Sequence, residues 1–175
     1  MGLRPARCYT RVHRAFTRVS QRKPRKSYIK GVPGSKIHQF EMGVKGDYPK
    51  VLRLIAKQRV QIRHNALEAA RMAVTQHLTK RLSKGKQYFM KVRPYPHHVI
   101  RENPMATGAG ADRFQQGMRM SFGRPIGTAA QVRAGQIIMD LYVDEASVNV
   151  AKAALKVASH KIPTTSKITI EDVKK

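Results

Sequence analysis

The sequence predicts an α+β fold in which two helices pack on a mostly antiparallel sheet, with a basic N-terminal arm and a long glycine-rich loop. Three observations support it. Residues 65–82 and 145–158 carry apolar residues at helical spacing, and shorter apolar or alternating segments lie around them. Residues 103–127 contain five glycines and separate two of these shorter segments. Residues 1–40 hold eleven Lys or Arg and no acidic residue.

The clearest expected element is the helix over residues 65–82. Asn65 is a candidate N-terminal cap, and Glu68 lies three residues later in the capping-box position. Gly85 follows the last turn, where a left-handed cap is favoured. The residues that predict the core face are Leu67, Ala70, Val74 and Leu78.

Four basic residues of this segment are expected mostly outside that face. They are Arg71, Lys80, Arg81 and Lys84. Basic residues in a last turn stabilise the helix dipole, which is one interpretation of them. Contact with phosphate groups is a second interpretation, compatible with the first.

The remaining regular segments are predicted to be strands. We expect strands over residues 37–42, 51–56 and 87–93, with residues 97–101 returning as the hairpin partner of the third. Residues 130–143 alternate and predict one long strand, with a break at Gly135 as the alternative. Residues 145–158 predict the second helix, and Ile168 with Ile170 a short last strand. The domain organisation is then an arm over residues 1–35 and one α+β domain over residues 36–175.

Charge is the strongest indication of function. The chain has 35 Lys or Arg against 10 Asp or Glu, a formal net charge of +25. Before Asp140 there are 29 basic and five acidic residues, whereas six Lys and five acids follow from Asp140 onward. Such an excess of one sign is tolerated when a polyanion screens it, and nucleic acid is the usual one. The near-neutral C-terminal fifth is expected to face away from that polyanion.

The arm is expected to be extended, because several prolines disfavour helix at the residues before them. A short cationic helix over residues 10–19 is the alternative, since arginines recur there at helical spacing. Arginine binds phosphates bidentately, and the aromatic rings of Tyr9, Phe16 and Tyr28 offer stacking faces. Alternatively, Phe16, Ile29 and Val32 anchor the arm to the core. The arm residues predicted to bind nucleic acid are Arg4, Arg7, Arg11, Arg14, Arg18, Arg22, Lys23, Arg25 and Lys26.

Several chemistries are not expected. Cys8 is the single cysteine, so an internal disulfide is excluded, and Cys8 with His13 is too small a set for a metal site. His97 and His98 are adjacent and face opposite sides of a strand, one packed and one exposed. The pair Gly108-x-Gly110 is not a dinucleotide fingerprint. No apolar run approaches membrane-spanning length, and no secretory signal follows Met1. We expect no cofactor, metal, membrane or small-molecule substrate.

The segment 103–127 is expected to be a functional loop, because compact domains rarely carry loops of this length without a role. Arg113, Arg119 and Arg124 are its candidate phosphate ligands. Phe114 and Met118, four residues apart, predict one helical turn. A disordered insertion is the alternative, but it leaves Met105, Met118, Met120 and Phe122 as exposed apolar groups without a role. A loop that orders only against a partner explains both its glycines and its apolar residues.

Four segments resemble one protein family over almost the whole chain. They are RPARCYTR, NALEAARMAVTQHL, VRPYPHHVIREN and AGADRFQQGMRMSFGRPIGTAAQVRAGQ. They are similar to the large-subunit ribosomal protein called L-ten-e in archaea and eukaryotes, the counterpart of bacterial L-sixteen. The length, without an extended C-terminal tail, favours an archaeal member. The last thirty residues are the least distinctive.

The resemblance implies a structural, non-enzymatic constituent of the large ribosomal subunit, in cytoplasmic ribosomes. It implies binding to 23S-type rRNA, with 5S rRNA nearby, and contact with neighbouring ribosomal proteins. Arg71 and Lys84 join the arm residues as expected rRNA contacts. The loop is expected to approach tRNA acceptor arms and the peptidyl-transferase centre. Its implied residues are Asn103, Met105, Gly108, Gly110, Arg113, Gly117, Arg119, Phe122 and Arg124.

Two other classes of protein remain as alternatives. An RNA-modifying enzyme or nuclease would use His97, His98 or Glu102 as acid or base, but no nucleophile or metal cluster accompanies them. A DNA-compacting protein would share the positive charge, but would not need the glycine- and methionine-rich loop.

Overall fold

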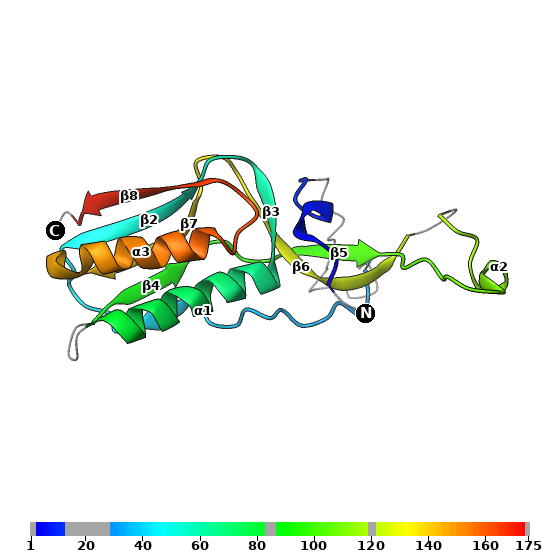
Figure 1. The fold of residues 1–175 in the computed structure, drawn as a ribbon, viewed down its shortest axis with the longest axis horizontal. Helices are drawn as coiled ribbons and strands as arrows, with labels where there is room; N and C mark the ends of the chain where they lie inside the picture. Colours follow the sequence, from blue (N-terminus) through cyan, green and yellow to red (C-terminus); the bar gives the residue numbers. More distant parts are fainter. Residues whose placement is uncertain (1–2, 13–28, 83–86, 119–121, 174–175) are drawn as a thin grey trace, which may run out of the picture.

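The computed structural model describes residues 3–12, 29–82, 87–118 and 122–173, and the expected α+β class is confirmed (Figure 1). The elements in chain order are η1 (Ala6–Cys8), β1 (Glu41–Gly43), β2 (Lys50–Ala56), β3 (Val60–Arg63), α1 (His64–Arg81), β4 (Phe89–Val92), β5 (His98–Glu102), α2 (Ala111–Phe114), β6 (Arg124–Val132), β7 (Ile137–Val143), η3 (Glu145–Ser147), α3 (Val148–Ser159) and β8 (Ser166–Asp172).

The strands form two antiparallel sheets. The larger has the order β1-β4-β7-β2-β8, and the smaller has the order β3-β6-β5. Two expectations are therefore wrong. β5 pairs with β6 and not with β4, because the segment with Pro94 and Pro96 leads the chain out of the larger sheet. The single long strand expected over residues 130–143 is two strands in different sheets, and the alternative of a break at Gly135, which has φ +79°, is confirmed.

Both long helices cover the same face of the five-stranded sheet and lie side by side (Figure 1). The predicted face of α1 is confirmed, since Leu67, Ala70, Val74 and Leu78 are all fully buried. Helix α3 contributes Ala151, Ala154, Leu155 and Ala158 to the same core. A buried leucine of this kind contributes roughly 1.5–3 kcal/mol through removal of apolar surface from water.

The start of α1 differs from the prediction. The helix begins at His64 directly after β3, and its N-terminal cap, Arg63, makes no side-chain capping bond. Asn65 lies inside the helix, and Glu68 bonds to Arg71, so the expected capping box is wrong. Pairing of β3 with β6 determines where the helix can begin, and β3 was not predicted from the sequence, because its alternation of apolar and polar residues covers only four positions.

The other elements follow the predictions with shifted ends. β2, β4 and β8 lie where strands were expected, whereas only the end of the segment 37–42 forms β1. The second helix begins with the short η3 turn and continues as α3.

The hairpin of β5 and β6 reaches away from the helices, and α2 lies at its far end (Figure 1). The end of β8 lies at the opposite end of the molecule, where it pairs with the start of β2 (Figure 1). We call the five-stranded sheet with α1 and α3 the body. The three-stranded sheet, the described arm residues 3–12 and the loop form the extension. In the parts of the chain that are described, no helix is long and apolar enough to cross a bilayer.

Candidate nucleic-acid interface

The described part of the arm lies against β3 in the extension. The backbone N–H of Gln61 donates to the carbonyl oxygen of Thr10 over 2.9 Å, and its side-chain amide donates to Tyr9 O over 3.1 Å. Arg63 Nη1 donates to the carbonyl oxygen of Arg4 over 2.9 Å. Because these bonds use arm backbone, they hold the segment while leaving arm side chains available.

The arginines of this segment differ in exposure. Arg7 and Arg11 are exposed, and Arg4 is half-exposed and paired with Glu102. Ile29 is buried, which matches the interpretation of an anchor to the core, and Val32 is half-buried. Most of the alternative helix over residues 10–19 lies outside the described residues, as do Phe16 and Tyr28. The same holds for Arg14, Arg18, Arg22, Lys23, Arg25 and Lys26.

The loop is shorter than expected. It runs from Asn103 to Gly123, because Arg124 already pairs with Glu102 as the first residue of β6. Gly127, the expected end of the loop, is a buried strand residue beside His64. A Cβ at position 127 would lie 3.0 Å from His64 Nε2, so glycine is needed there for close packing. Burial in this contact lowers the pKa of His64.

Polar contacts within the loop hold its described residues. The side-chain oxygen of Gln115 accepts from the N–H of Ala106 over 2.6 Å, and its amide nitrogen donates to the Pro104 carbonyl over 2.8 Å. Asn103 Nδ2 donates to the carbonyl oxygen of Gly117 over 3.4 Å. These contacts join the start of the loop to Gln115 and Gly117 within its described part. This role of Gln115 was not predicted from the sequence, because a single glutamine in a glycine-rich segment forms no pattern that indicates two hydrogen bonds to the backbone.

Apolar side chains of the loop are exposed. Phe114 at the end of α2 is 85% exposed and Met118 is 71% exposed. Met118 lies beyond α2, so the expected helical turn joining the two residues is wrong. Phe122 is also exposed, and the guanidinium of Arg101 lies 3.9 Å from its ring centre and donates to its carbonyl oxygen. Exposed rings beside guanidinium groups are typical of surfaces that stack on unpaired bases.

The other loop residues predicted as functional are placed as follows. Arg113 and Arg124 are exposed, one on α2 and one at the start of β6, and Met105 is exposed as well. Arg119 lies outside the described residues. Three of the predicted glycines have left-handed backbone, namely Gly108, Gly110 and Gly117.

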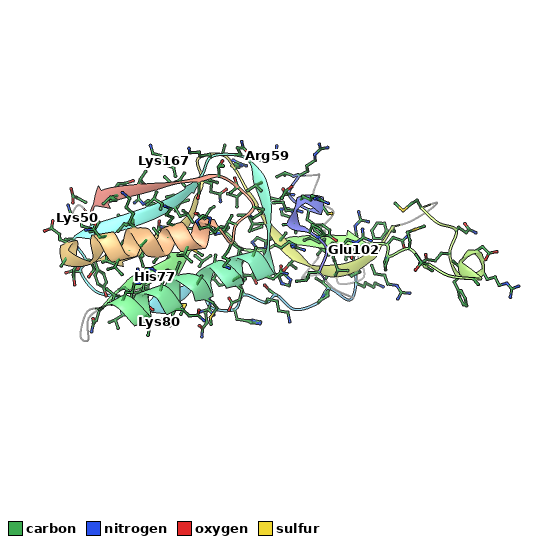
Figure 2. The ribbon with its side chains drawn as sticks, viewed as in Figure 1. Lys50, Arg59, His77, Lys80, Glu102 and Lys167 are labelled. Carbon is green, nitrogen blue, oxygen red and sulfur yellow. The ribbon has the colours of Figure 1, made fainter. Side chains whose placement is uncertain are left out.

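The basic residues of α1 differ from the prediction at Arg71. Its side chain is buried, and Arg71 Nε donates to Glu68 Oε2 over 2.8 Å. This bond lowers the pKa of Glu68 and raises the pKa of Arg71. Because its charge is already neutralised, we leave Arg71 out of the interface. Lys80 and Arg81 are exposed in the last turn (Lys80 in Figure 2), and Lys84 lies outside the described residues.

The three candidate acid or base residues of an enzyme, His97, His98 and Glu102, do not come together in one reactive group. His97 is exposed with its ring centre 4.5 Å from that of Tyr95, and His98 is half-buried, which lowers its pKa. The Glu102 carboxylate accepts from Tyr9 and Arg4. Among the described residues no three His, Cys, Asp or Glu side chains come together as a metal site.

Exposed arginines and rings on an arm and a loop, carried by a stable α+β body, define a nucleic-acid-binding protein of structural type. The chain belongs to the ribosomal protein L16p/L10e family, whose sequence profile matches residues 16–169. The family resemblance in the sequence is thereby confirmed.

Archaeal relatives are similar over nearly their full length. Large ribosomal subunit protein uL16 of Archaeoglobus fulgidus is 45% identical over 172 residues, covering 98% of this chain and 94% of the relative. The protein of the same name from Sulfolobus acidocaldarius is 48% identical over 178 residues, covering 100% and 97%. That of Hyperthermus butylicus is 47% identical over 176 residues, covering 99% and 96%.

Proposed function

We propose that this protein is a structural, non-enzymatic constituent of the large subunit of cytoplasmic ribosomes. Its partners are large-subunit rRNA of the 23S type, with 5S rRNA nearby, and neighbouring ribosomal proteins. Its loop helps to position tRNA acceptor arms near the peptidyl-transferase centre. Similarity over nearly the whole chain to relatives named as large ribosomal subunit proteins supports this proposal.

The observation that carries the proposal is the unequal charge of the two ends of the molecule. The arm and the hairpin expose Arg7, Arg11, Arg113 and Arg124 at one end. At the other end the acids are matched by bases, as where Lys50 bonds Asp172. RNA phosphates therefore favour the extension, and the balanced end of the body suits contact with proteins or solvent.

In this proposal the arm over residues 1–35 is the rRNA anchor. The functional loop of the single domain over residues 36–175 is narrowed to residues 103–123, with Arg124 at its base. Guanidinium groups bind phosphate oxygens, and Phe114 and Phe122 offer rings to unpaired bases. The backbone contacts of the arm with β3 hold the described segment with Arg7 and Arg11 beside the smaller sheet.

The rRNA part of the proposal is tested by the salt dependence of binding to a large-subunit rRNA fragment. The double variant Arg7→Ala/Arg11→Ala removes two exposed charges of the arm, and Lys152→Ala/Lys156→Ala removes two exposed charges of α3 as the matched control. We expect the arm variant to reduce the slope of log K against log salt by about 1.4–1.8, since each phosphate contact contributes roughly 0.7–0.9. An equal reduction of this slope in both variants would contradict an interface on the extension.

The tRNA part is tested on assembled subunits. Replacing residues 104–122 by two glycines keeps Asn103 and Gly123 and closes the hairpin with a short turn. We expect subunits carrying this variant to contain the protein at normal levels and to bind aminoacyl-tRNA more weakly. Normal tRNA affinity would remove the loop from the proposal while leaving the rRNA anchor untouched.

A further inference from the structure

Glu102 is an unexpected residue for its position. Only Glu102 and Asp112 are acidic between Glu68 and Asp140, and Glu102 lies in the extension, at the end of β5 (Figure 2). A carboxylate close to phosphate contacts repels the ligand that the surrounding arginines attract. The side chain of Glu102 is only 16% exposed. Contacts within the protein therefore explain the presence of a carboxylate here better than contacts with solvent do.

The side chain of Glu102 joins the strand to the arm. Its Oε1 atom accepts a hydrogen bond from the Tyr9 hydroxyl and an ion-pair contact from Arg4 Nε at 2.7 Å. The Tyr9 ring is covered by the guanidinium of Arg63, whose carbon lies 5.4 Å from the ring centre. Two arm residues thus converge on a single carboxylate oxygen, and a β3 residue holds one of them from the other side.

The backbone of Glu102 closes the loop. Glu102 pairs with Arg124 in the last pair of the β5–β6 ladder. Gly123 packs on the Glu102 backbone with φ +81°, and a Cβ at position 123 would lie 3.1 Å from the Glu102 carbonyl carbon and oxygen. Both ends of the loop therefore meet at residue 102, the same residue whose side chain binds the arm.

We propose that Glu102 is a positioning residue that latches the N-terminal arm to the base of the loop, so that the seating of the arm and the orientation of the loop are coupled. For translation this rests on the proposed function, because the arm would then transmit its rRNA contact to the loop near tRNA. In the free protein the latch is a property of the fold alone.

The chemistry of the latch favours a constant contact over a pH switch. Burial, together with the hydrogen bond to Glu102, raises the pKa of Tyr9 to about 12. The hydroxyl therefore remains a donor throughout the physiological pH range. The hydrogen bond from Tyr9 to Glu102 is thus not interrupted by ionisation of Tyr9 at physiological pH.

The free protein allows a direct test, because Cys8 is the single cysteine, is exposed and precedes Tyr9. A second label is placed on α2 at the exposed Asp112 as Asp112→Cys. Distances between spin labels at positions 8 and 112 are measured by pulsed electron paramagnetic resonance. We expect one narrow distribution with native Glu102, and a broader one with a faster-moving label at position 8 in Glu102→Ala. Glu102→Gln, which keeps an acceptor for Tyr9 but loses the charge for Arg4, should fall between them.

Glu41→Gln is the matched control, since Glu41 also binds two cations, Lys45 and Lys91, but lies on β1 in the body. This control should leave the label distances unchanged. Glu102→Ala and Glu41→Gln should both melt cooperatively. An unchanged distribution in Glu102→Ala overturns the latch, and so does an equal broadening in Glu41→Gln. A loss of cooperative melting in Glu102→Ala alone would also overturn it, because the residue would then support the fold in general. Tyr9→Phe gives a second test that leaves Glu102 in place, and it should also free the label at position 8.

Addition of the rRNA fragment separates this inference from the proposed function. If the protein does not bind the fragment, the proposed function fails while the free-protein distances still decide the latch. If it binds, we expect the distance distribution to stay narrow with native Glu102 and broad in Glu102→Ala. A narrow distribution in both bound proteins would show that RNA orients the loop without Glu102, and would overturn the coupling.

Discussion

The body and the loop of the extension are stabilised in different ways. The body buries large apolar side chains between α1, α3 and the five-stranded sheet, among them Leu52, Leu67 and Leu155 with no exposed surface. The extension leaves Phe114 and Met118 exposed and holds its loop with amide hydrogen bonds from Gln115. The strands β3 and β6 share the core of the body through Ile62 and Ala130, so it is the arm and the loop that keep their binding groups exposed while the rest of the chain supplies the free energy of folding.

Charge follows the same division. In the body Asp140 is fully buried and is bound by Arg93, with Arg53 Nε 3.7 Å away. In the extension Arg7, Arg113 and Arg124 are exposed. Arg93 of the body therefore completes the structure, whereas the exposed arginines of the arm and the loop are available to a polyanion.

The largest effect is expected from opening a cavity in the body. Leu78→Ala should lower the free energy of unfolding by about 2–5 kcal/mol, because Leu78 is fully buried under α1. Met72→Ala on the same helix is the control, since Met72 is 41% exposed. Denaturant unfolding of both variants measures the difference. Similar losses would mean that the assigned core face of α1 is wrong.

The buried carboxylate of the body should give the next largest effect. Asp140→Ala removes charged hydrogen bonds to Arg93 and should cost about 1.5–3 kcal/mol of unfolding free energy. Arg93 is 43% exposed and can turn to solvent, so the loss is smaller than for an enclosed pair. Asp140→Asn, which keeps the shape, should recover part of it. If Asp140→Ala left the free energy of unfolding unchanged, the pair of Asp140 and Arg93 would contribute no net stability.

Changes in the loop should hardly affect folding. Replacement of residues 104–122 by two glycines should change the free energy of unfolding by less than about 1 kcal/mol, because its large apolar residues are already exposed. Gln115→Ala should likewise leave unfolding unchanged, while amide exchange at Ala106 speeds up as its acceptor is lost. A loss of unfolding free energy as large as that of Leu78→Ala would show that the loop is part of the core, and would contradict the contrast between body and loop.

The latch should give a smaller effect at alkaline pH. The pKa of Tyr9 is raised to about 12 by burial and by the bond to Glu102, from an ordinary value of 10.0. A group held in its neutral form by the fold contributes stability that is present below pH 10 and is lost as pH rises toward 12. Burial also raises the pKa of Tyr48, so ultraviolet titration should show late-ionising tyrosines of which one disappears in Tyr9→Phe and ionises earlier in Glu102→Gln. Unchanged titration in both variants would contradict the contact.

The smallest effect is expected from the exposed ion pairs of β1. Hydrogen bonds from Lys45 and Lys91 lower the pKa of Glu41 to about 2. The contribution of Glu41 to stability is therefore present above about pH 4.5 and is lost as pH falls toward 2. Exposed pairs of this kind contribute little. Nuclear magnetic resonance titration of the Glu41 carboxyl provides the measurement, and Lys91→Ala should bring its pKa closer to the ordinary value.

Local patterns in the sequence were sufficient to predict the elements that neighbouring residues determine. The buried face of α1 follows from apolar residues at helical spacing, and β2, β4 and β8 follow from apolar segments of strand length. The place of the loop follows from its glycines, and the cationic character of the arm from composition alone. In each of these cases neighbouring residues carry the information, because backbone geometry determines which of them share a face.

Partners that are distant in the sequence were decided by the tertiary structure. The division of residues 130–143 between two sheets depends on which strands lie beside them, and the pattern is the same for either sheet. Arg71 is buried because Glu68 and the β1 segment surround it, whereas its spacing alone placed it outside the core face. Glu102 and Tyr9 meet across 93 residues of chain. The sequence determined that this protein presents an arm and a loop of positive charge. Only packing decided that one carboxylate joins them, since a hydrogen bond depends on where two groups lie in space.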